Sequence, residues 1–308
     1  MTTVKTPRKK TGWFKRDWRL YLMLLIPVVW YLLFCYKPMA GVMIAFQKYS
    51  LVKGMWGSKF VGWKNFAFVM KQRDFLPALI NTLKLNIMGL IVGFPVPVIL
   101  AIMLNEIQSR GVKRVSQTLL YLPHFLSWVV IAGIWKSFLA PGEDSAINMI
   151  IGFFGQDAVD LLTDKGAIRW VLFFCEAWRS LGWDSIVFYT AIIGISADIY
   201  EAAALDGASR KDIILHIILP ELLIPMTTVF ILNLGFFMSA GFDQVYNFTN
   251  ASVNSVIDIL DTYVNRIGIE NGQYSLGTAV SLIKGVVGLI LVYGTHITSK
   301  KLTGEGVW

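Results

Sequence analysis

Long apolar stretches separated by short polar segments run along almost the whole chain. Most of them approach or exceed the roughly twenty apolar residues that an α-helix needs to cross the hydrocarbon core of a membrane. We therefore predict an all-α, polytopic membrane protein with six transmembrane helices. The expected spans are residues 19–34 (or 19–46), 77–104, 119–139, 168–195, 222–240 and 276–297.

The polar segments set the expected domain organisation. Residues 1–18 form a basic tail, residues 19–297 form the six-span domain, and residues 298–308 form a second tail. A polar loop at 196–220 interrupts the six-span domain. Little chain remains outside these parts, so we expect no separate soluble domain.

Composition supports a membrane protein, and the position of the basic residues explains the positive net charge. The chain has 308 residues, of which 55% are hydrophobic, and a formal net charge of +8. Its mean hydropathy is +0.58, which is too apolar for an ordinary soluble domain. Seven basic residues lie within the first nineteen positions, beside the first span, where they set orientation in the membrane. Nucleic acid is therefore not an expected partner.

Counting lysine and arginine residues in the loops predicts the orientation. With the N-terminus inside, cytoplasmic segments carry 14 basic residues and external segments carry 8. Cytoplasmic loops normally hold the excess, so we expect both termini and the loop 196–220 to lie in the cytoplasm of a multi-pass cell-membrane protein. The first external loop, residues 47–76, is an exception to this bias because it carries six basic residues.

The chain offers no catalytic or metal-binding constellation. Its three histidines, His124, His216 and His296, lie in separate segments, and neither H-E-x-x-H nor G-x-S-x-G occurs. Cys35 and Cys175 lie in apolar runs without metal-ligand spacing. The P-loop pattern G-x-x-x-x-G-K-[ST] is also absent. We expect no catalytic residue, no metal and no cofactor on this chain. If the protein works with ATP, the ATPase must therefore be a separate chain.

One polar segment in the C-terminal half carries a strict pattern. The residues EAAALDGASRKDIILHIILP occupy 201–220 and predict two short helices joined by a turn. Asp198 is expected to cap the first helix, with Glu201 as its partner. Gly207 is expected to end it, because glycine accepts the left-handed conformation that closes a helix.

The second short helix is expected to begin at a capping pair, Ser209 and Asp212. Pro220 is expected to stop it. One face of this helix is apolar and carries Ile213, Ile214, Ile217 and Ile218. The segment is too polar for the bilayer and too apolar to stand alone in water, which indicates docking.

The spacing E-A-A-x3-G-x9-I-x-L-P resembles the coupling-loop signature of type I ABC importer permeases. Its seven fixed residues would coincide by chance at ~10⁻⁸ per start site. The resemblance implies a loop that seats in a groove on a cytoplasmic ATPase, with Glu201 as a polar anchor, Gly207 as the turn and the isoleucine face as the hydrophobic contact. The implied ATPase-coupling residues are Glu201, Ala202, Ala203, Asp206, Gly207, Ile217, Leu219 and Pro220.

The fourth span is the richest in polar groups, which are costly inside a membrane. Glu176 and Arg179 are three residues apart and can pair on one helix face. Sugars bind where aromatic faces lie beside hydrogen-bonding groups, so one interpretation is a solute path. The other is an internal ion pair with packing aromatics, and the sequence leaves both open. The candidate solute-path residues are Glu176, Trp178, Arg179, Trp183, Asp184 and Asn233.

Further motifs narrow the resemblance to the oligosaccharide and polysaccharide branch, the LplB-like permeases of the maltose-permease superfamily. They are Tyr121–Phe125, Gly241–Gln244, Leu260–Val264 and Gly304–Gly306. The branch implies ATP-driven import of an oligosaccharide or glycan fragment by alternating access. It also implies a second homologous permease chain in a heterodimer, two ATPase subunits that bind ATP-Mg, and an extracellular solute-binding protein.

Two alternatives stay open. One is a permease for another small polar solute such as glycerol phosphate, which a cavity rich in basic residues would favour. The other is a membrane-embedded scaffold or enzyme subunit that uses 201–220 for docking.

Overall fold

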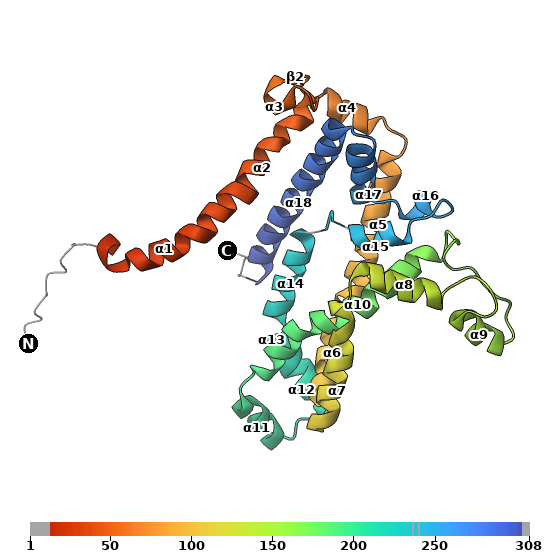
Figure 1. Cartoon of the computed structure of the whole chain (residues 1–308). Helices are drawn as coiled ribbons and strands as arrows, with labels where there is room; N and C mark the ends of the chain where they lie inside the picture. The colour runs from red at the N-terminus through yellow and green to blue at the C-terminus, as the bar shows by residue number, and fades with distance from the viewer. Residues whose placement is uncertain (1–12, 236, 240, 304–308) are drawn as a thin grey trace, which may run out of the picture.

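The structure is a computed structural model that describes residues 13–235, 237–239 and 241–303. This part of the chain is an elongated array of helices with one small hairpin at an end (Figure 1). The opposite end is formed by α11 (Ala197–Leu205). Most of the predicted tail 1–18, the motif 304–306 and the predicted end of the fifth span at 240 lie outside the described residues.

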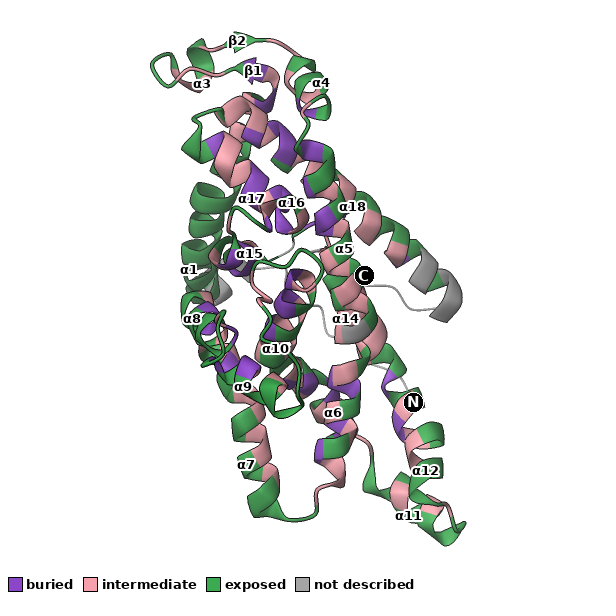
Figure 2. Ribbon diagram, turned by 90° about the vertical axis from the view of Figure 1, so that its right-hand side faces the viewer, coloured by how far each residue is buried: buried purple, intermediate pink, exposed green. Residues whose placement is uncertain are grey.

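The first span follows the longer of the two predicted extents. α1 (Trp13–Tyr31), η1 (Leu32–Tyr36), α2 (Lys37–Met39) and η2 (Ala40–Phe46) follow one another without a break. The apolar part covers 29 residues, 18–46, and none of its most apolar window is buried. The part from α1 to α2 therefore stands away from the remaining helices (Figure 1), and its residues 18–39 are exposed (Figure 2), whereas η2 packs against α18.

A hairpin follows the C-terminal end of the first span. β1 (Gln47–Lys48) pairs antiparallel with β2 (Lys59–Phe60), and α3 (Gly54–Gly57) lies in the connection. α4 (Lys64–Met70) leads from the hairpin to the second span. The connection from 47 to 76, predicted only as a loop, is therefore folded.

The second predicted span is a single long element, whereas the third is broken. α5 (Phe75–Gly93) and α6 (Pro95–Glu106) together form a 32-residue apolar helix. α7 (Arg110–Tyr121) and η3 (Leu122–Phe125) meet α8 (Trp128–Phe138) at a bend of 105°. The third predicted span, 119–139, is therefore not one continuous helix but two helices joined at this bend.

The break has a local cause in the sequence. Pro123 has no backbone N–H to continue a helix, and Ser127 starts a new one. Its side chain accepts a hydrogen bond from the Val130 N–H at 3.4 Å, the usual N-cap arrangement.

The fourth span forms the centre of the structure. α10 (Ile168–Ile193) is a 26-residue helix, as predicted within two residues at its end, and it packs mainly on α6. α9 (Ala146–Phe153) lies in the loop before it. The fifth span contributes α14 (Leu223–Gly235). Its 13 residues reach only ~20 Å, so crossing the bilayer requires the preceding helix, which meets it at 52°. α18 (Tyr274–Thr303) is the sixth span.

The polar segment 241–275, which lies between the fifth and sixth predicted spans, contributes part of the core. It contains α15 (Phe242–Phe248), α16 (Asn254–Ile257), α17 (Leu260–Val264) and η5 (Asn265–Glu270). Val245, Phe248 and Ile257 are buried against α8 and α10. The polar composition hid these apolar positions because the buried residues are interspersed with asparagines.

Buried polar groups fasten this segment to the spans. The Arg169 guanidinium donates to the Val256 carbonyl and to Asn81 Oδ1, both at 3.0 Å, and Asn81 donates to the Asp258 carbonyl at 3.0 Å. Lys284 forms an ion pair with Asp261. Asn81 and Lys284, two polar positions inside predicted spans, are thus satisfied within the chain.

Candidate functional site

The first helix of the predicted coupling loop is α11. Its N-cap is Ser196, whose side chain accepts from the Asp198 N–H at 3.3 Å. The predicted cap at Asp198 is therefore wrong by two residues, and Asp198 lies in the first turn instead. The helix end is confirmed: Gly207 has φ +75°. The Ala208 N–H donates to the Ala203 carbonyl at 2.9 Å, which closes a Schellman turn.

The second helix starts as predicted but does not stop at the proline. α12 (Arg210–Ile213) begins with the reciprocal capping of Ser209 and Asp212. It continues through η4 (Ile214–Ile218) into α13 (Leu219–Glu221), which contains Pro220. The wide turn of η4 brings the Leu219 N–H to the Ile214 carbonyl. Because this turn shifts the hydrogen-bond register, the missing N–H of Pro220 is accommodated without ending the helix.

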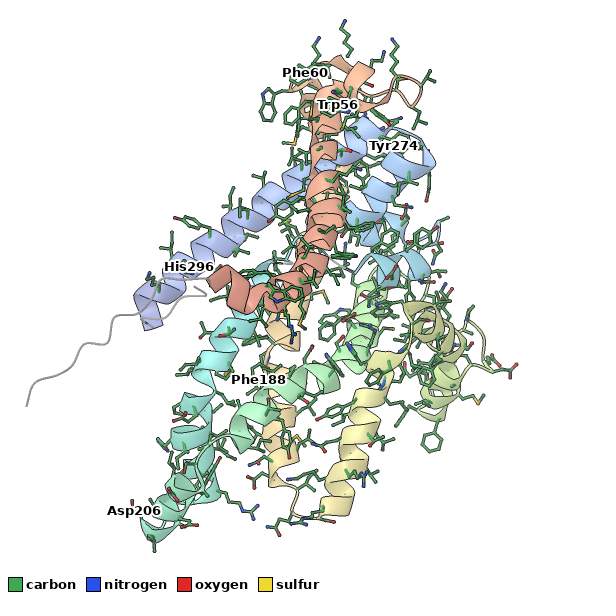
Figure 3. All side chains as sticks on the ribbon, turned by 60° about the vertical axis from the view of Figure 1, so that its left-hand side comes forward. Trp56, Phe60, Phe188, Asp206, Tyr274 and His296 are labelled. Atoms are coloured by element: carbon green, nitrogen blue, oxygen red, sulfur yellow. The ribbon has the colours of Figure 1, made fainter. Side chains whose placement is uncertain are left out.

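The loop exposes its first helix and buries part of its second. Glu201, Ala202, Asp206 and Gly207 are exposed, and Leu205 is 89% exposed at the tip. Ala203, Ile217 and Leu219 are partly buried, while Pro220 is exposed. Asp206 lies at the extreme end of the molecule (Figure 3). This end presents a mainly small and polar surface with an exposed leucine at its tip.

The predicted isoleucine contact with the ATPase requires a correction. Ile218 is 1% exposed, and Ile213 and Ile214 pack with it against Phe188 of α10 and Val98 of α6. These side chains anchor the loop to its own spans. Arg210 adds an ion pair to Glu106, the last residue of α6, at 2.8 Å. Movement of the loop is thus linked to the second and fourth spans.

The capping pair of Ser209 and Asp212 should make the stability of the start of α12 depend on pH. Hydrogen bonds from the Ser209 hydroxyl and N–H lower the pKa of Asp212 below its ordinary value. Because the folded-state pKa is lowered, the ionised Asp212 carboxylate stabilises the cap at pH values above the ordinary aspartate pKa of about 3.9. This contribution is lost as the pH falls through the folded-state pKa. At neutral pH the cap is intact. We expect Ser209→Ala to speed amide hydrogen exchange in residues 209–214, measured on the full chain.

A matched control is Ser109→Ala, which removes the equivalent cap of α7 and should affect only residues 109–114. Acidification should reduce the difference between wild type and Asp212→Asn. A difference that stays constant below pH 3.9 would contradict the assignment of the cap to the carboxylate.

A cavity of about 440 Å³ lies between the spans, at a distance from the coupling loop along the molecule. α5, α10 and α14 line it, with Trp128 at the start of α8. Its polar lining consists of Asn86, Glu176, Arg179, Ser180, Asp184, Asn233, Ser239 and Gln244. Four of the six predicted solute-path residues, Glu176, Arg179, Asp184 and Asn233, thus come together around one space.

The expected ion pair between Glu176 and Arg179 is not formed in the described part of the chain. Ser180 donates to Glu176 Oε1 at 2.5 Å. Arg179 instead lies over the indole of Trp128, with Cζ 5.1 Å from the ring centroid. The guanidinium is attracted to the aromatic face, which the bend before α8 brings within reach. Among the described residues, Ser180 is the hydrogen-bond partner of the glutamate, so both charges remain at the cavity wall.

The two predicted tryptophans lie outside the cavity lining. Trp178 packs edge-on against Trp135, with ring centroids 6.1 Å apart. Trp183 stacks on His124, with centroids 4.4 Å apart and an interplanar angle of 3°. Trp128, which the sequence analysis missed, lines the cavity together with Phe94, Phe173 and Phe237. The sequence feature that could have identified Trp128 is the N-cap residue Ser127, which follows Pro123 and starts a new helix at this tryptophan.

Because Trp128 lines the cavity and Trp178 does not, their substitution by alanine should have different effects. Trp128→Ala should weaken the apparent affinity for transported solute by about fivefold, because an aromatic contact contributes about 1 kcal/mol. Trp178→Ala is the matched control and should alter packing rather than affinity. Uptake kinetics in proteoliposomes measure the first effect, and a thermal unfolding midpoint measures the second. Equal affinity losses in both variants would contradict the assignment of Trp128 to the solute path.

Among the residues that the structure describes, His, Cys, Asp and Glu side chains nowhere form a group of three that could hold a metal ion.

Comparison with known proteins places this architecture in a family. Residues 89–297 match the family model described as binding-protein-dependent transport system inner membrane component. Protein LplB of Bacillus subtilis (strain 168) is 39% identical over 99% of this chain and 96% of its own length. The polygalacturonan/rhamnogalacturonan transport system permease protein YteP of the same organism is 39% identical over 94% of this chain and 90% of its own length.

A solved structure agrees with the fold. It is a bacterial alginate ABC transporter in complex with an alginate pentasaccharide-bound periplasmic protein, and one of its chains superposes with a TM-score of 0.88. The two chains are 34% identical, and the match covers 96% of this chain and 98% of the other. The predicted resemblance and fold class are confirmed, as is a transport subunit in place of an enzyme. The chain belongs to the binding-protein-dependent transport system inner membrane components, the permease subunits of ABC importers.

Proposed function

We propose that the chain is one of two permease subunits of an importer that moves an oligosaccharide or a polysaccharide fragment. The observation that carries this substrate class is the cavity, in which the indole of Trp128 lies beside hydrogen-bonding groups from three spans. Sugar rings stack their C–H faces on aromatic rings, and their hydroxyls take hydrogen bonds from amides and charged groups. The names of the relatives, which transport polygalacturonan/rhamnogalacturonan and alginate, support the same class.

The charge of the cavity argues against the phosphate alternative. Arg179 is the one basic residue among the lining residues, against two acidic ones, Glu176 and Asp184. A phosphate site would require several cations or backbone N–H groups around the anion. The second alternative, a scaffold or enzyme subunit, has no support from the family assignment.

The proposed complex contains a second, homologous permease chain, two ATPase subunits that bind ATP-Mg, and an external solute-binding protein. This chain itself binds no cofactor in the proposal. Both termini and the coupling loop face the cytoplasm, in accord with the count of basic residues. The exposed face of α11, with Glu201, Asp206 and Leu205, is the proposed contact with the ATPase.

Coupling follows from the attachment of the loop. ATP binding closes the ATPase dimer and displaces α11, and the continuous helix from α12 to α13 carries the displacement to α14. The isoleucine anchor and the Arg210–Glu106 ion pair carry it to α6 and α10. The ATPase shifts the permease between its two conformational states only if it binds the loop more tightly in one state than in the other.

The test is ATPase activity of the reconstituted complex with its binding protein. The panel contains neutral oligosaccharides, oligosaccharides of uronic acids, glycerol phosphate and a peptide. Stimulation by one class of glycan is the expected result and identifies the cargo. Stimulation by glycerol phosphate or peptide alone would overturn the substrate class while leaving the coupling loop in place.

A further inference from the structure

The cavity between the spans is rich in hydrogen-bond acceptors, because several of its donors are already used within the chain. The Ser180 hydroxyl donates to Glu176 Oε1 at 2.5 Å. Asn86 Nδ2 and Gln244 Nε2 each donate to a backbone carbonyl, at 2.9 and 2.5 Å. This arrangement leaves the amide oxygens of Asn86 and Gln244 and the second oxygen of Glu176 to accept hydrogen bonds from a bound molecule.

One cation stands against two carboxyl groups at this wall. Arg179 is the single basic residue among the lining residues that the structure describes, and Glu176 and Asp184 are the acidic ones. All three belong to α10. With both carboxyl groups ionised, the wall that this chain contributes has a net negative charge.

The face and the edge of the arginine have different surroundings. One face of the Arg179 guanidinium lies over the indole of Trp128, with Cζ 5.1 Å from the ring centroid. Its Nε is buried and has no hydrogen-bond partner in the described part of the chain. Arg179 therefore keeps donor capacity for a solute, while the aromatic contact holds its position.

Hydroxyl groups fit such a wall better than carboxylates do. A sugar hydroxyl donates its hydrogen to a carboxylate or amide oxygen, and its own oxygen accepts from Arg179. An ionised glycan carboxylate only accepts, so it would have Arg179 as its one cationic partner and would share the cavity with Glu176 and Asp184. Unpaired like charges in a site are a means of rejecting the wrong ligand. Their repulsion is stronger in a partly buried cavity than in water, because the local dielectric constant is lower.

We propose that this cavity selects uncharged oligosaccharides over glycans of uronic acids, with Glu176 and Asp184 as the specificity-determining residues. This inference rests on the proposed function, which supplies an oligosaccharide cargo without deciding its charge. The two carboxylates accept hydrogen bonds from the hydroxyls of a neutral glycan and repel the carboxylate of an acidic one.

The test measures glycan binding to the detergent-solubilised complex of permeases and ATPases, without binding protein, by isothermal titration calorimetry. The probes are tetrasaccharides of glucose, galactose, xylose or arabinose and tetrasaccharides of galacturonic or mannuronic acid. We expect at least one neutral tetrasaccharide to bind on the order of tenfold more tightly than either acidic one. Omitting the binding protein separates the selectivity of the cavity from that of the protein that delivers the solute.

The double variant Glu176→Gln/Asp184→Asn removes both negative charges and keeps the size of the side chains. Glutamine at 176 can still accept from Ser180. The ratio of neutral to acidic affinity should fall on the order of tenfold, mainly through tighter binding of the uronic-acid tetrasaccharides. A thermal unfolding midpoint checks the folding of the complex. If the double variant does not assemble, each single variant carries the test and should lower the ratio several-fold.

Asp157→Asn is the matched control, since it removes one exposed acidic side chain of the loop before α10 that does not line the cavity. It should leave the affinity ratio unchanged. Equal or tighter binding of the acidic tetrasaccharides by wild type overturns the inference, and so does an unchanged ratio in a folded double variant.

The proposed function is judged separately, by stimulation of the ATPase in the presence of binding protein. Stimulation by a glycan, together with no binding of any tetrasaccharide to the complex alone, overturns the selectivity of this cavity and leaves the importer function standing. Failure of every glycan to stimulate the ATPase overturns the proposed function and this inference with it.

Discussion

Gly207→Pro is expected to separate ATP hydrolysis from uptake while leaving the chain inserted in the membrane. Gly207 has φ +75°, whereas proline holds φ near −65°. Proline also removes the N–H that donates to the Ala204 carbonyl at 3.2 Å. The turn between α11 and α12 must then re-form in another shape, and α11 no longer points in its original direction. We expect uptake per ATP hydrolysed to fall by at least about tenfold, a coupling loss of about 1.4 kcal/mol.

Gly207→Asn is the matched control, because asparagine enters the left-handed region far more readily than most residues. It should retain most of the coupling. Uptake of labelled substrate and phosphate release, measured on the same proteoliposomes, provide the ratio. Normal uptake by the proline variant would show that the loop does not transmit the movement.

Gly182→Ala is expected to be the most damaging single-methyl substitution in the spans. A Cβ at this position of α10 would lie 2.1 Å from the Leu120 carbonyl oxygen and 2.6 Å from its carbon. These are backbone atoms of α7 and cannot rotate away, so the two helices must separate. Overpacking typically costs about 1–3 kcal/mol, and a clash with backbone belongs at the upper end. A fall in the thermal unfolding midpoint of the solubilised complex measures it.

Gly133→Ala in α8 is the comparison, since no atom lies within 4 Å of the Cβ position there. It should be nearly neutral. The prediction fails if Gly182→Ala unfolds at the same temperature as wild type and Gly133→Ala.

Local signals in the sequence account for what was predicted correctly. The turn at Gly207 and the cap at Ser209 depend on a few neighbouring residues, so a short pattern describes them fully. α10 was predicted closely because a long apolar run has only one stable form in a membrane. The cap at Asp198 was assigned two residues too late because Ser196 competes for the same role.

The arrangement of side chains around the cavity could not be predicted from short sequence patterns. Sequence spacing paired Glu176 with Arg179, but the structure turns Arg179 toward Trp128, about fifty residues earlier in the chain. The same reasoning chose Trp178 and Trp183, which share a helix with the charged groups but do not line the cavity. Which face of α10 meets the cavity depends on the helices around it, and spacing along one helix carries no such information.

The membrane class, most of the spans, the turn at Gly207 and the family could be predicted from the sequence, because each follows from hydrophobic length or from residues that interact over one or two helical turns. The bend at Pro123, the folding of 241–275 into the core and the burial of the isoleucine face of the loop became visible only in the tertiary structure. It also brought Asn86, Trp128, Arg179 and Gln244 to one cavity. These depend on contacts between residues distant in the chain, and such contacts are chosen by the packing of whole helices rather than by any local pattern.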